Sequence, residues 1–474
     1  MHRSRTPRDP AGVHSAESYE LLERHIRVSS VPPTSSLQAA PASGLPRPGS
    51  RLLPVFGGTT TAGDFAVALR SLLGRGELVH GPAIEEYERR FARIVGVAHG
   101  TSFSTARVGL YGLLRVFGVE PGDEVLIQAP THVVVANAIR YAGARPVYVD
   151  CTLKDYNIDM ALAEQRVTSK TRALVLQHTF GVPADIEGAH ALAHRHGLRL
   201  IEDCVHALGA TWDGRQIGSF GDAAIFSTEE TKTISTTMGG MVVTDDAEIA
   251  AGMRAFQETC PWPDREVTAR RLLKFLVYHL VTEPHLHRPT RALYERFGRR
   301  NPLLRPTVHQ ELIGVRPARY EERLANALAV LGVRQLDRLD ENVRHRRLIA
   351  EAYRVRLSAK GYATTEVPAR AEPSPVRYPV WVADRPATLE RMAPHATLGT
   401  WFTSVVEEVL APEYVDYEQG SCPVAEAAAR HLVNVPTHPH VQLGDVESIV
   451  AALPEPTAQR ETAARPGPPL PAAA

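Results

Sequence analysis

The chain has 474 residues, and its 53 Lys and Arg balance its 53 Asp and Glu, so the formal net charge is zero. A protein that binds a polyanion usually carries a basic excess, so nucleic acid is not expected as a main partner. Hydrophobic residues make up 44% of the chain and charged residues 22%, which is typical of a globular enzyme and excludes disorder throughout.

The four cysteines (Cys151, Cys204, Cys260 and Cys422) are far apart and form no CxxC pair. This spacing predicts neither a disulfide framework nor a metal site, and it favours a reducing, cytoplasmic environment. No run of 18 apolar residues occurs, so no membrane-spanning helix is predicted. A secretory signal is not expected either, because no apolar core follows the charged N-terminus.

The two ends of the chain differ in composition from the rest. Residues 1–50 are rich in Pro, Ser, Arg and Ala, with one short helical-looking stretch, and residues 455–474 are similar. Such segments bury too little apolar surface to offset their conformational entropy. Both are therefore predicted to be disordered tails.

Between residues 98 and 246, short apolar runs alternate with helical-looking segments. Continuous apolar strands that alternate with amphipathic helices predict a largely parallel sheet covered on both faces. In such a sheet the chemistry lies beyond the carboxyl ends of the strands. The predicted strands are 124–128, 146–150, 173–178, 198–203, 223–227 and 240–245, and the helical segments are 133–143, 158–167 and 187–197.

Residues 261–305 form a basic insert with ten Lys or Arg against four acidic residues, and they include the apolar run LLKFLVYHLV at 272–281. One interpretation is a solvated surface excursion, and a less favoured one is an amphipathic helix on a membrane or a partner. Residues 320–357 are predicted to form one long helix, because leucines recur in it at near-helical spacing. Residues 360–453 mix strands and helices and predict a smaller C-terminal domain.

Three polar side chains follow two of the predicted strands. Asp203 ends the strand at 198–203, where a buried carboxylate needs a positively charged partner. Ser227 ends the strand at 223–227, and the polar loop after it carries Lys232. An aspartate for a pyridinium nitrogen, a hydroxyl for a phosphate and a lysine for an imine are the groups of a pyridoxal phosphate site. Taken singly, each has an ordinary alternative as a turn or surface residue.

The stretch from residue 81 to 246 resembles the DegT/DnrJ/StrS family of pyridoxal phosphate-dependent aminotransferases. The motifs that carry the resemblance are GPAIEEYERRFARIVGVAHG, PGDEVLIQAPTH, IEDCVHALGATWDGRQIGSFGDAAIFS and ETKTISTTMGGMVV, with CPVAEAAARHLVNVPTHP downstream. The resemblance implies an α/β fold of type I. It predicts a large cofactor-binding domain at 51–340, which contains the insert 261–305, and a small α+β domain at 341–454.

The resemblance also implies roles for four residues. Lys232 is expected to form the imine with the cofactor and to move the proton during the reaction, which requires a neutral amine. Asp203 should pair with the pyridine nitrogen, and Ser227 should bind the phosphate. His206 occupies the family's Gln/His position and should touch the phenolic oxygen or cover the ring. The alternative for His206 is a histidine packed in a helix.

The phosphate cradle departs from the family pattern. Ser104 and Thr105 stand where the family usually has Gly-Thr at the start of a helix, and Ala106 follows. Their hydroxyls and amides can still bind a phosphate, because a helix N-terminus attracts anions. His132 falls where the family places an aromatic ring on the cofactor, with a surface turn as the alternative. Glu321 falls where the family has an asparagine that reaches the partner subunit's phosphate, so that contact is expected to be absent or replaced.

The resemblance implies transfer of an amino group from an amino acid to a keto-sugar or a keto-cyclitol. The donor expected from the family is glutamate or glutamine, and the keto-sugar is nucleotide-linked in most of the family. A homodimer with sites at the subunit boundary is expected, in secondary-metabolite or cell-envelope biosynthesis. The insert could then meet a sugar-nucleotide pyrophosphate. Two alternatives remain: a pyridoxamine phosphate-dependent sugar dehydratase, which would have histidine in place of Lys232, and a regulatory relative without turnover.

Overall fold

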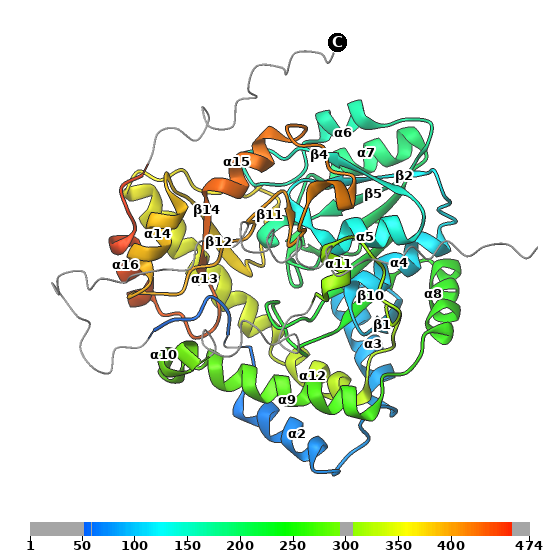
Figure 1. Cartoon of the computed structure of the whole chain (residues 1–474), viewed down its shortest axis with the longest axis horizontal. Coiled ribbons are helices and arrows are strands. Elements are labelled where there is room, and N and C mark those ends of the chain that lie inside the picture. Colours follow the sequence, from blue (N-terminus) through cyan, green and yellow to red (C-terminus); the bar gives the residue numbers. More distant parts are fainter. Residues whose placement is uncertain (1–51, 58, 294–306, 457–474) are drawn as a thin grey trace, which may run out of the picture. The chain divides into compact units, whose positions relative to one another are not determined.

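The fold is centred on a seven-stranded sheet in the order β1-β10-β9-β6-β5-β2-β4 (Figure 1). Neighbouring strands from β9 to β4 in this order are parallel, whereas β10 is antiparallel to both β9 and β1. The expected, largely parallel sheet is therefore confirmed. The strands are β1 (His99–Phe103), β2 (Glu124–Gln128), β4 (Arg145–Val149), β5 (Thr171–Gln177), β6 (Arg199–Asp203), β9 (Ala223–Ser227) and β10 (Gly240–Thr244).

The computed structural model describes residues 52–57, 59–293 and 307–456. The predicted tail 1–50 lies outside the described residues, and so does the predicted tail 455–474 except for its first two positions. The six predicted strands all form, with ends that differ by at most two residues from the prediction. Strand β1 was not predicted, because its sequence HGTSF lacks an apolar run.

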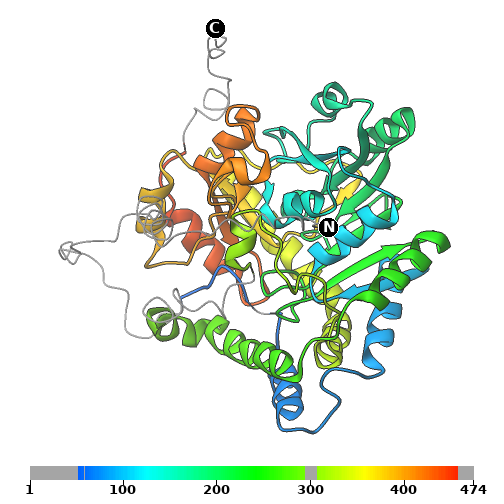
Figure 2. The same ribbon diagram turned by 45° about the vertical axis from the view of Figure 1, so that its right-hand side comes forward.

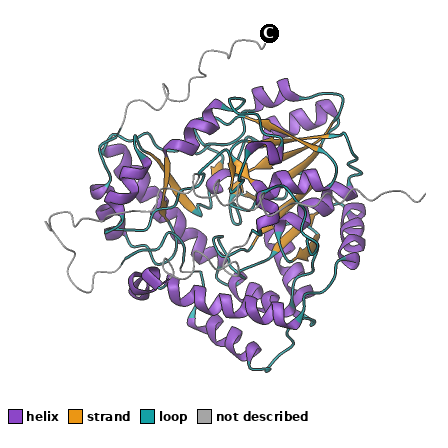
Figure 3. Cartoon of the chain, viewed as in Figure 1, coloured by secondary structure: helices purple, strands orange, loops and turns teal. Residues whose placement is uncertain are grey.

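Helices cover both faces of the sheet (Figure 3). Along a strand, successive side chains point to opposite faces. Leu126 of β2 accordingly joins one core cluster, together with α3 (Ala83–Val95), α7 (Ile186–His196) and α12 (Asn326–Leu336), whereas its neighbours Val125 and Ile127 join the other. That second cluster contains residues of α4 (Ala106–Val116), α5 (Val133–Tyr141) and α8 (Ala247–Thr259).

The prediction of one long helix over 320–357 is wrong. Two helices, α12 and α13 (Leu339–Ala359), form there, and Leu324 precedes both. The leucine spacing did not reveal the break, because the irregular five-residue step from Leu331 to Leu336 lies inside α12 and the helix ends only after it. Leu336 and Leu339 are both buried, so the chain turns at Asp337 and Arg338 to place them in the same core.

The basic insert is neither fully solvated nor separate from the fold. It forms α9 (Arg265–Thr282), which packs against α2 (Ala62–Leu72), and α10 (Pro284–Leu293) (Figure 2). Leu272, Phe275 and Leu276 of α9 belong to the main core, which corrects the interpretation of a surface excursion. The last part of the insert, 294–305, lies outside the described residues. Within the described ranges, no helix is both long enough and apolar enough to cross a membrane.

The C-terminal part has a core of its own, in which α13 packs with a two-stranded sheet and α16. Short strand pairs join this part to the region of the large sheet: β11 pairs with β7, and β13 pairs with β3. The remaining elements are β3 (Thr131–His132), α6 (Met160–Arg166), η1 (Thr179–Gly181), β7 (Thr211–Trp212), β8 (Arg215–Gln216), α11 (His309–Leu312), β11 (Ala371–Glu372), β12 (Arg377–Trp381), α14 (Arg385–Met392), β13 (Val406–Glu407), η4 (Pro412–Val415), α15 (Pro423–His431), β14 (Leu432–Pro436) and α16 (Leu443–Ala452).

Candidate active site

A cavity of about 960 Å³ opens beyond the carboxyl ends of β5, β6 and β9, where a parallel sheet places its chemistry. Seven of the eight residues predicted from the sequence line it, although they come from four separate segments of the chain. Ser104 is the exception. The seven are Thr105, Ala106, His132, Asp203, His206, Ser227 and Lys232.

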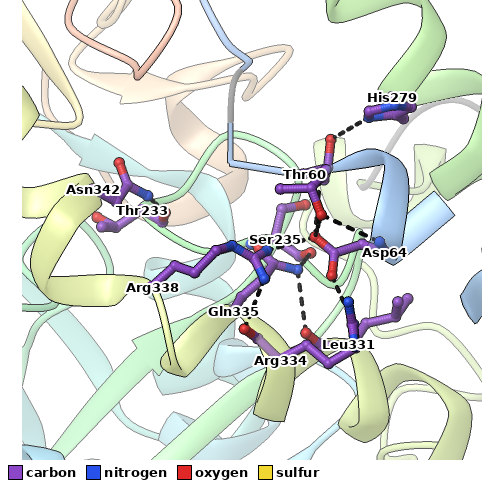
Figure 4. Close-up of polar contacts among 11 residues, drawn as sticks. Thr60, Asp64, Thr233, Ser235, His279, Leu331, Arg334, Gln335, Arg338 and Asn342 are labelled. Carbon is purple, nitrogen blue, oxygen red and sulfur yellow. Dashed lines mark hydrogen bonds and ion pairs between the residues drawn. The ribbon is translucent and has the colours of Figure 1, made fainter.

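Lys232 lies in the loop between β9 and β10, which has no regular secondary structure. Side chains of two helices hold this loop through hydrogen bonds to Thr233 and Ser235 (Figure 4). The Ser235 N–H donates to Gln335 Oε1 at 2.7 Å, and the Gln335 amide donates back to the Ser235 carbonyl. Asn342 donates to the Thr233 carbonyl at 2.6 Å. Two side chains of α12 and α13 thus satisfy the buried backbone of the loop and fix the position of Lys232.

The helices that hold this loop are themselves tied to α2 through Asp64 (Figure 4). The fully buried Asp64 carboxylate accepts hydrogen bonds from Arg334 Nε, at 3.0 Å, and from Arg338. It also caps its own helix by accepting from the Thr61 N–H at 3.0 Å. Because the Thr61 hydroxyl also donates to it at 3.0 Å, the carboxylate accepts four hydrogen bonds and is well compensated for its burial. This contact therefore anchors the helices that hold the lysine loop.

The Lys232 amine is enclosed. The side chain is 9% exposed, and its Nζ lies 4.4 Å from the centre of the Trp401 ring. The pKa of Lys232 is lowered to about 8, chiefly by burial and to a lesser extent by the charge of Arg377, against the opposing effect of Glu229. A lysine in this state carries a substantial neutral fraction near neutral pH, as a nucleophile or base requires.

Asp203 ends β6 and is 1% exposed. Burial raises the pKa of Asp203 to about 6, against the hydrogen bond from the Val205 N–H and the charge of Lys232. The preceding Glu202 differs, because it accepts from the N–H groups of Gly218, Phe220 and Gly221 and contacts His178. Glu202 is therefore saturated with structural partners, whereas Asp203 faces the cavity and would gain from a cationic one.

The N-terminus of α4 forms another wall of the cavity. Thr105 is its N-cap, but the Thr105 side chain makes no capping hydrogen bond, and its buried Oγ1 has no hydrogen-bond partner among the described residues. The first amides of a helix attract anions. A Cβ at Gly240 would lie 2.2 Å from the Ala106 nitrogen, so only glycine lets β10 approach this helix start so closely.

Ser104 is directed elsewhere. Its N–H donates to the Glu322 carbonyl at 2.9 Å, and the residue does not line the cavity. Its role in cofactor binding stays a prediction. Glu321, which stands at the family's asparagine position, pairs with Arg316 and does not line the cavity either. Glu322 pairs with Arg271 of the insert at 2.6 Å.

The two cavity histidines are held differently. His132 is the N-cap of α5, with its Nδ1 accepting from the Val134 N–H at 3.3 Å and its Nε2 3.6 Å from Glu408. His206 lies in a turn after β6 rather than in a helix, and its ring centre is 4.6 Å from that of Trp401. Its buried Nδ1 has no partner within the described part of the chain. Burial lowers the pKa of both imidazoles, which keeps them neutral.

The sequence reasoning missed Trp401 and the contribution of α9. Trp401 covers the lysine amine, and the aromatic pair Trp401-Phe402 was the available signal in the sequence. Five residues of α9 line the cavity: Lys274, Val277, Tyr278, Val281 and Thr282. Lys274 pairs with Glu230 at 2.7 Å, and the Tyr278 hydroxyl donates to the Glu230 carbonyl.

Comparison with known proteins agrees with this site. A model of the DegT/DnrJ/EryC1/StrS aminotransferase family matches residues 60–271 and 279–454. The chain belongs to this family. The gap in the match falls inside α9, so this helix is where the chain departs from the family model. Family, α/β fold and the class of enzyme, an aminotransferase, are thereby confirmed, and the family is pyridoxal phosphate-dependent.

Three similar proteins illustrate the family. GDP-perosamine synthase of Caulobacter vibrioides is 28% identical over 378 residues, which cover 79% of this chain and 90% of that protein. A UDP-N-acetyl-3-dehydro-α-D-glucosamine 3-aminotransferase of Acidithiobacillus ferrooxidans is 36% identical over 200 residues, 42% of this chain and 54% of that one. The crystal structure of DesV from S. venezuelae, in complex with a ketimine intermediate, is 26% identical, has a TM-score of 0.64 and covers 85% of this chain and 95% of its own.

Proposed function

We propose that this chain is a pyridoxal phosphate-dependent sugar aminotransferase, which moves an amino group from an amino acid to a keto-sugar carried on a nucleotide. One observation carries the proposal: a buried amine with a lowered pKa, Lys232, faces the same cavity as Asp203, a buried carboxylate that forms no ion pair among the described residues. Two relatives with GDP- and UDP-linked sugars in their names support the nucleotide-linked acceptor.

The residues present fit the cofactor. Lys232 would hold its aldehyde carbon, Asp203 its ring nitrogen, and Ser227 and the start of α4 its phosphate, where Thr105 Oγ1 is without a partner among the described residues. His206, with its unpaired Nδ1 in the part of the chain described, would meet the ring or its oxygen. When bound, pyridoxal phosphate supplies an electron sink for the carbon that carries the amino group.

The chain's own residues would perform the proton chemistry. With a pKa of about 8, the Lys232 amine could move a proton between the substrate carbon and the cofactor carbon. Ionised Asp203 would keep a proton on the ring nitrogen, and a cation beside it would bring its pKa back down. Trp401 and α9 would exclude water from the transfer. A lysine at this position favours transamination over the dehydratase alternative.

We also propose a homodimer with its active sites at the subunit boundary. Val277 and Leu410 both line the cavity, and each is 41% exposed in the single chain, so a second subunit would bury apolar surface at the cavity mouth. A large domain at 51–340 and a small one at 341–454 are proposed from the separate C-terminal core. The four cysteines are free and buried, which supports a cytoplasmic location. The pathway proposed is secondary-metabolite or cell-envelope biosynthesis.

The test uses the purified full chain loaded with pyridoxal phosphate. We expect a visible absorbance band that is bleached by an amino donor from a panel including L-glutamate and L-glutamine, and restored by a keto-sugar nucleotide. Lys232→Ala should lose both the band and turnover, whereas Lys170→Ala, which alters an exposed loop lysine, should keep them. A band that no amino acid bleaches would favour the regulatory alternative.

A further inference from the structure

Arg377 is a buried cation beside the active site that the proposed chemistry does not use. It belongs to β12, is 1% exposed, and lies between two rings: its Cζ is 3.6 Å from the centre of Trp401 and 4.7 Å from that of Phe56. Its buried Nε and Nη2 donate no hydrogen bond within the described residues, where it also forms no ion pair. An arginine buried in this way is costly unless an anion joins it.

Another buried arginine nearby shows what a structural role requires. Arg346 donates to Asn342 Oδ1 at 2.9 Å, to the Val376 carbonyl at 3.1 Å and to Thr437 at 3.4 Å. Its guanidinium is therefore used within the fold, whereas Arg377, one residue after Val376, has rings on two sides and unused donors. The guanidinium fork of Arg377 is suited to a planar carboxylate, which it can bind through two parallel hydrogen bonds.

The position of Arg377 relative to Lys232 suggests which anion it meets. The Lys232 Nζ lies 4.4 Å from the same Trp401 ring, so the two cationic groups are no farther apart than the sum of their distances to it. In an α-amino acid, the amino nitrogen and the carboxylate are attached to the same carbon. A donor whose nitrogen is at Lys232 could therefore direct its α-carboxylate toward Arg377, which lies behind the cavity wall that Trp401 forms.

We propose that Arg377 binds the α-carboxylate of the amino-acid donor, with Trp401 and Phe56 shielding the pair from water. This inference rests on the proposed function. The cofactor phosphate has its own site at the start of α4, and a nucleotide pyrophosphate is too large for so enclosed a position. The charges of Glu229 and Glu407, which act on Arg377, also favour a singly charged carboxylate over a doubly charged phosphate.

The experiment combines one change in the protein with one change in the ligand. The kcat/KM of the donor half-reaction is measured for the wild type and for Arg377→Met. The donors are L-glutamate, L-glutamine and the α-amide of each, in which the α-carboxylate is replaced by a neutral amide. For the donors with a free α-carboxylate, kcat/KM should fall about 100-fold in the variant, which is the size expected for a charge-assisted pair. For the α-amides, kcat/KM should change little. An equal loss for acid and amide, or an acid preference that persists, overturns the proposal.

Thermal unfolding separates this role from a structural one. Arg377→Met removes a buried cation and keeps most of the volume, so the apoprotein should unfold at the same or a higher temperature. The matched control is Arg346→Met, which leaves buried acceptors without their donor and should therefore lower the unfolding temperature. It should keep the preference for the acid over its amide.

A failure of the proposed function would be visible separately. If no amino acid bleaches the wild-type holoenzyme, calorimetric titration with glutarate, a dicarboxylate without an amino group, takes the place of kinetics. Binding to the wild type that weakens at least about tenfold in Arg377→Met supports the carboxylate site. Equal binding to both proteins, or binding to neither, overturns it.

Discussion

The Nζ of Lys232 lies 4.4 Å from the centre of the Trp401 ring, although the two residues are 169 positions apart in the sequence. A cation over an aromatic face is attracted by the ring, but the same ring removes water from the amine. Burial is the larger effect here, since the pKa of Lys232 falls to about 8. The tryptophan thus helps to make a reactive lysine from an ordinary one.

The rate of cofactor loading should depend on pH through Lys232. Below its pKa of about 8 the neutral amine is the minor form, so the loading rate should rise about tenfold per pH unit and level off above it. Stopped-flow absorbance of the apoprotein mixed with pyridoxal phosphate measures this rate. A profile that is flat across that region would contradict the assignment of the attacking amine.

Asp203→Asn should lower the activity and raise the stability of the apoprotein at pH 7. Burial raises the pKa of Asp203 to about 6 from the usual 3.8, so between these values the folded protein binds more protons than the unfolded chain. Wild-type stability therefore falls as pH rises through that window. The apo variant should unfold at a higher temperature than wild type at pH 7, and the difference should vanish at strongly acid pH. Its transamination rate should fall at least about 100-fold; a wild-type rate would contradict the role given to Asp203.

Gln335→Ala tests the clamp behind the lysine loop. It leaves the buried N–H and carbonyl of Ser235 without their side-chain partner, which costs about 1–3 kcal/mol. We expect a lower unfolding temperature and a lower kcat, because the loop carries Lys232. Gln310→Ala, at an exposed position of α11, is the control and should change neither. An unchanged kcat in Gln335→Ala would mean that the loop is fixed by other contacts.

Lys274→Met tests whether the α9 wall contacts the acceptor. The change leaves Glu230 without its partner, but burial and Glu229 already raise the pKa of that carboxyl to about 8, so it can become neutral. If α9 meets the nucleotide, the acceptor KM should rise about fivefold or more and the donor KM should not. Arg270→Met, on the exposed side of α9, is the control. Deleting 261–305 is not informative, because Leu272 and Phe275 belong to the core.

Gly240→Ala should weaken cofactor binding. The added Cβ would lie 2.2 Å from the Ala106 nitrogen and must displace the start of α4, where the phosphate is expected. We expect the dissociation constant of pyridoxal phosphate to rise at least about tenfold, since phosphate binding at a helix N-terminus depends on the position of its amides. Gly444→Ala is the control, because nothing lies within 4 Å of its added Cβ. Unchanged affinity in Gly240→Ala would place the phosphate elsewhere.

Part of the site was predictable because several of its residues lie at or just after the ends of apolar strands, which the sequence pattern marks. The apolar runs at 198–203 and 223–227 become β6 and β9, which are neighbours in the sheet. Asp203 and Ser227, at the ends of those strands, must then share one edge, and Lys232 follows a few residues later. Thr105 was predicted from the family resemblance, which places it at the start of a helix.

Other parts of the site depend on contacts between distant segments. Trp401 and α9 line the cavity, and Arg377 lies against the Trp401 ring, although the local patterns of these segments say nothing about the site. Ser104 looks suited to a phosphate in the sequence, yet its amide is taken by the Glu322 carbonyl. The break between α12 and α13 also serves packing, because it places Leu336 and Leu339 in one core.

The amino-acid sequence by itself determined the α/β class and most of the order of strands and helices, because these follow from periodicity. Its resemblance to a family then predicted the lysine and the carboxylate. Only the tertiary structure decided which charged side chains are buried away from water and which of them have no hydrogen-bond partner among the described residues. Burial at one ring lowers the pKa of Lys232 and leaves the donors of Arg377 unused among the described residues. Burial is a property of all the segments that surround a residue, so no local pattern encodes it.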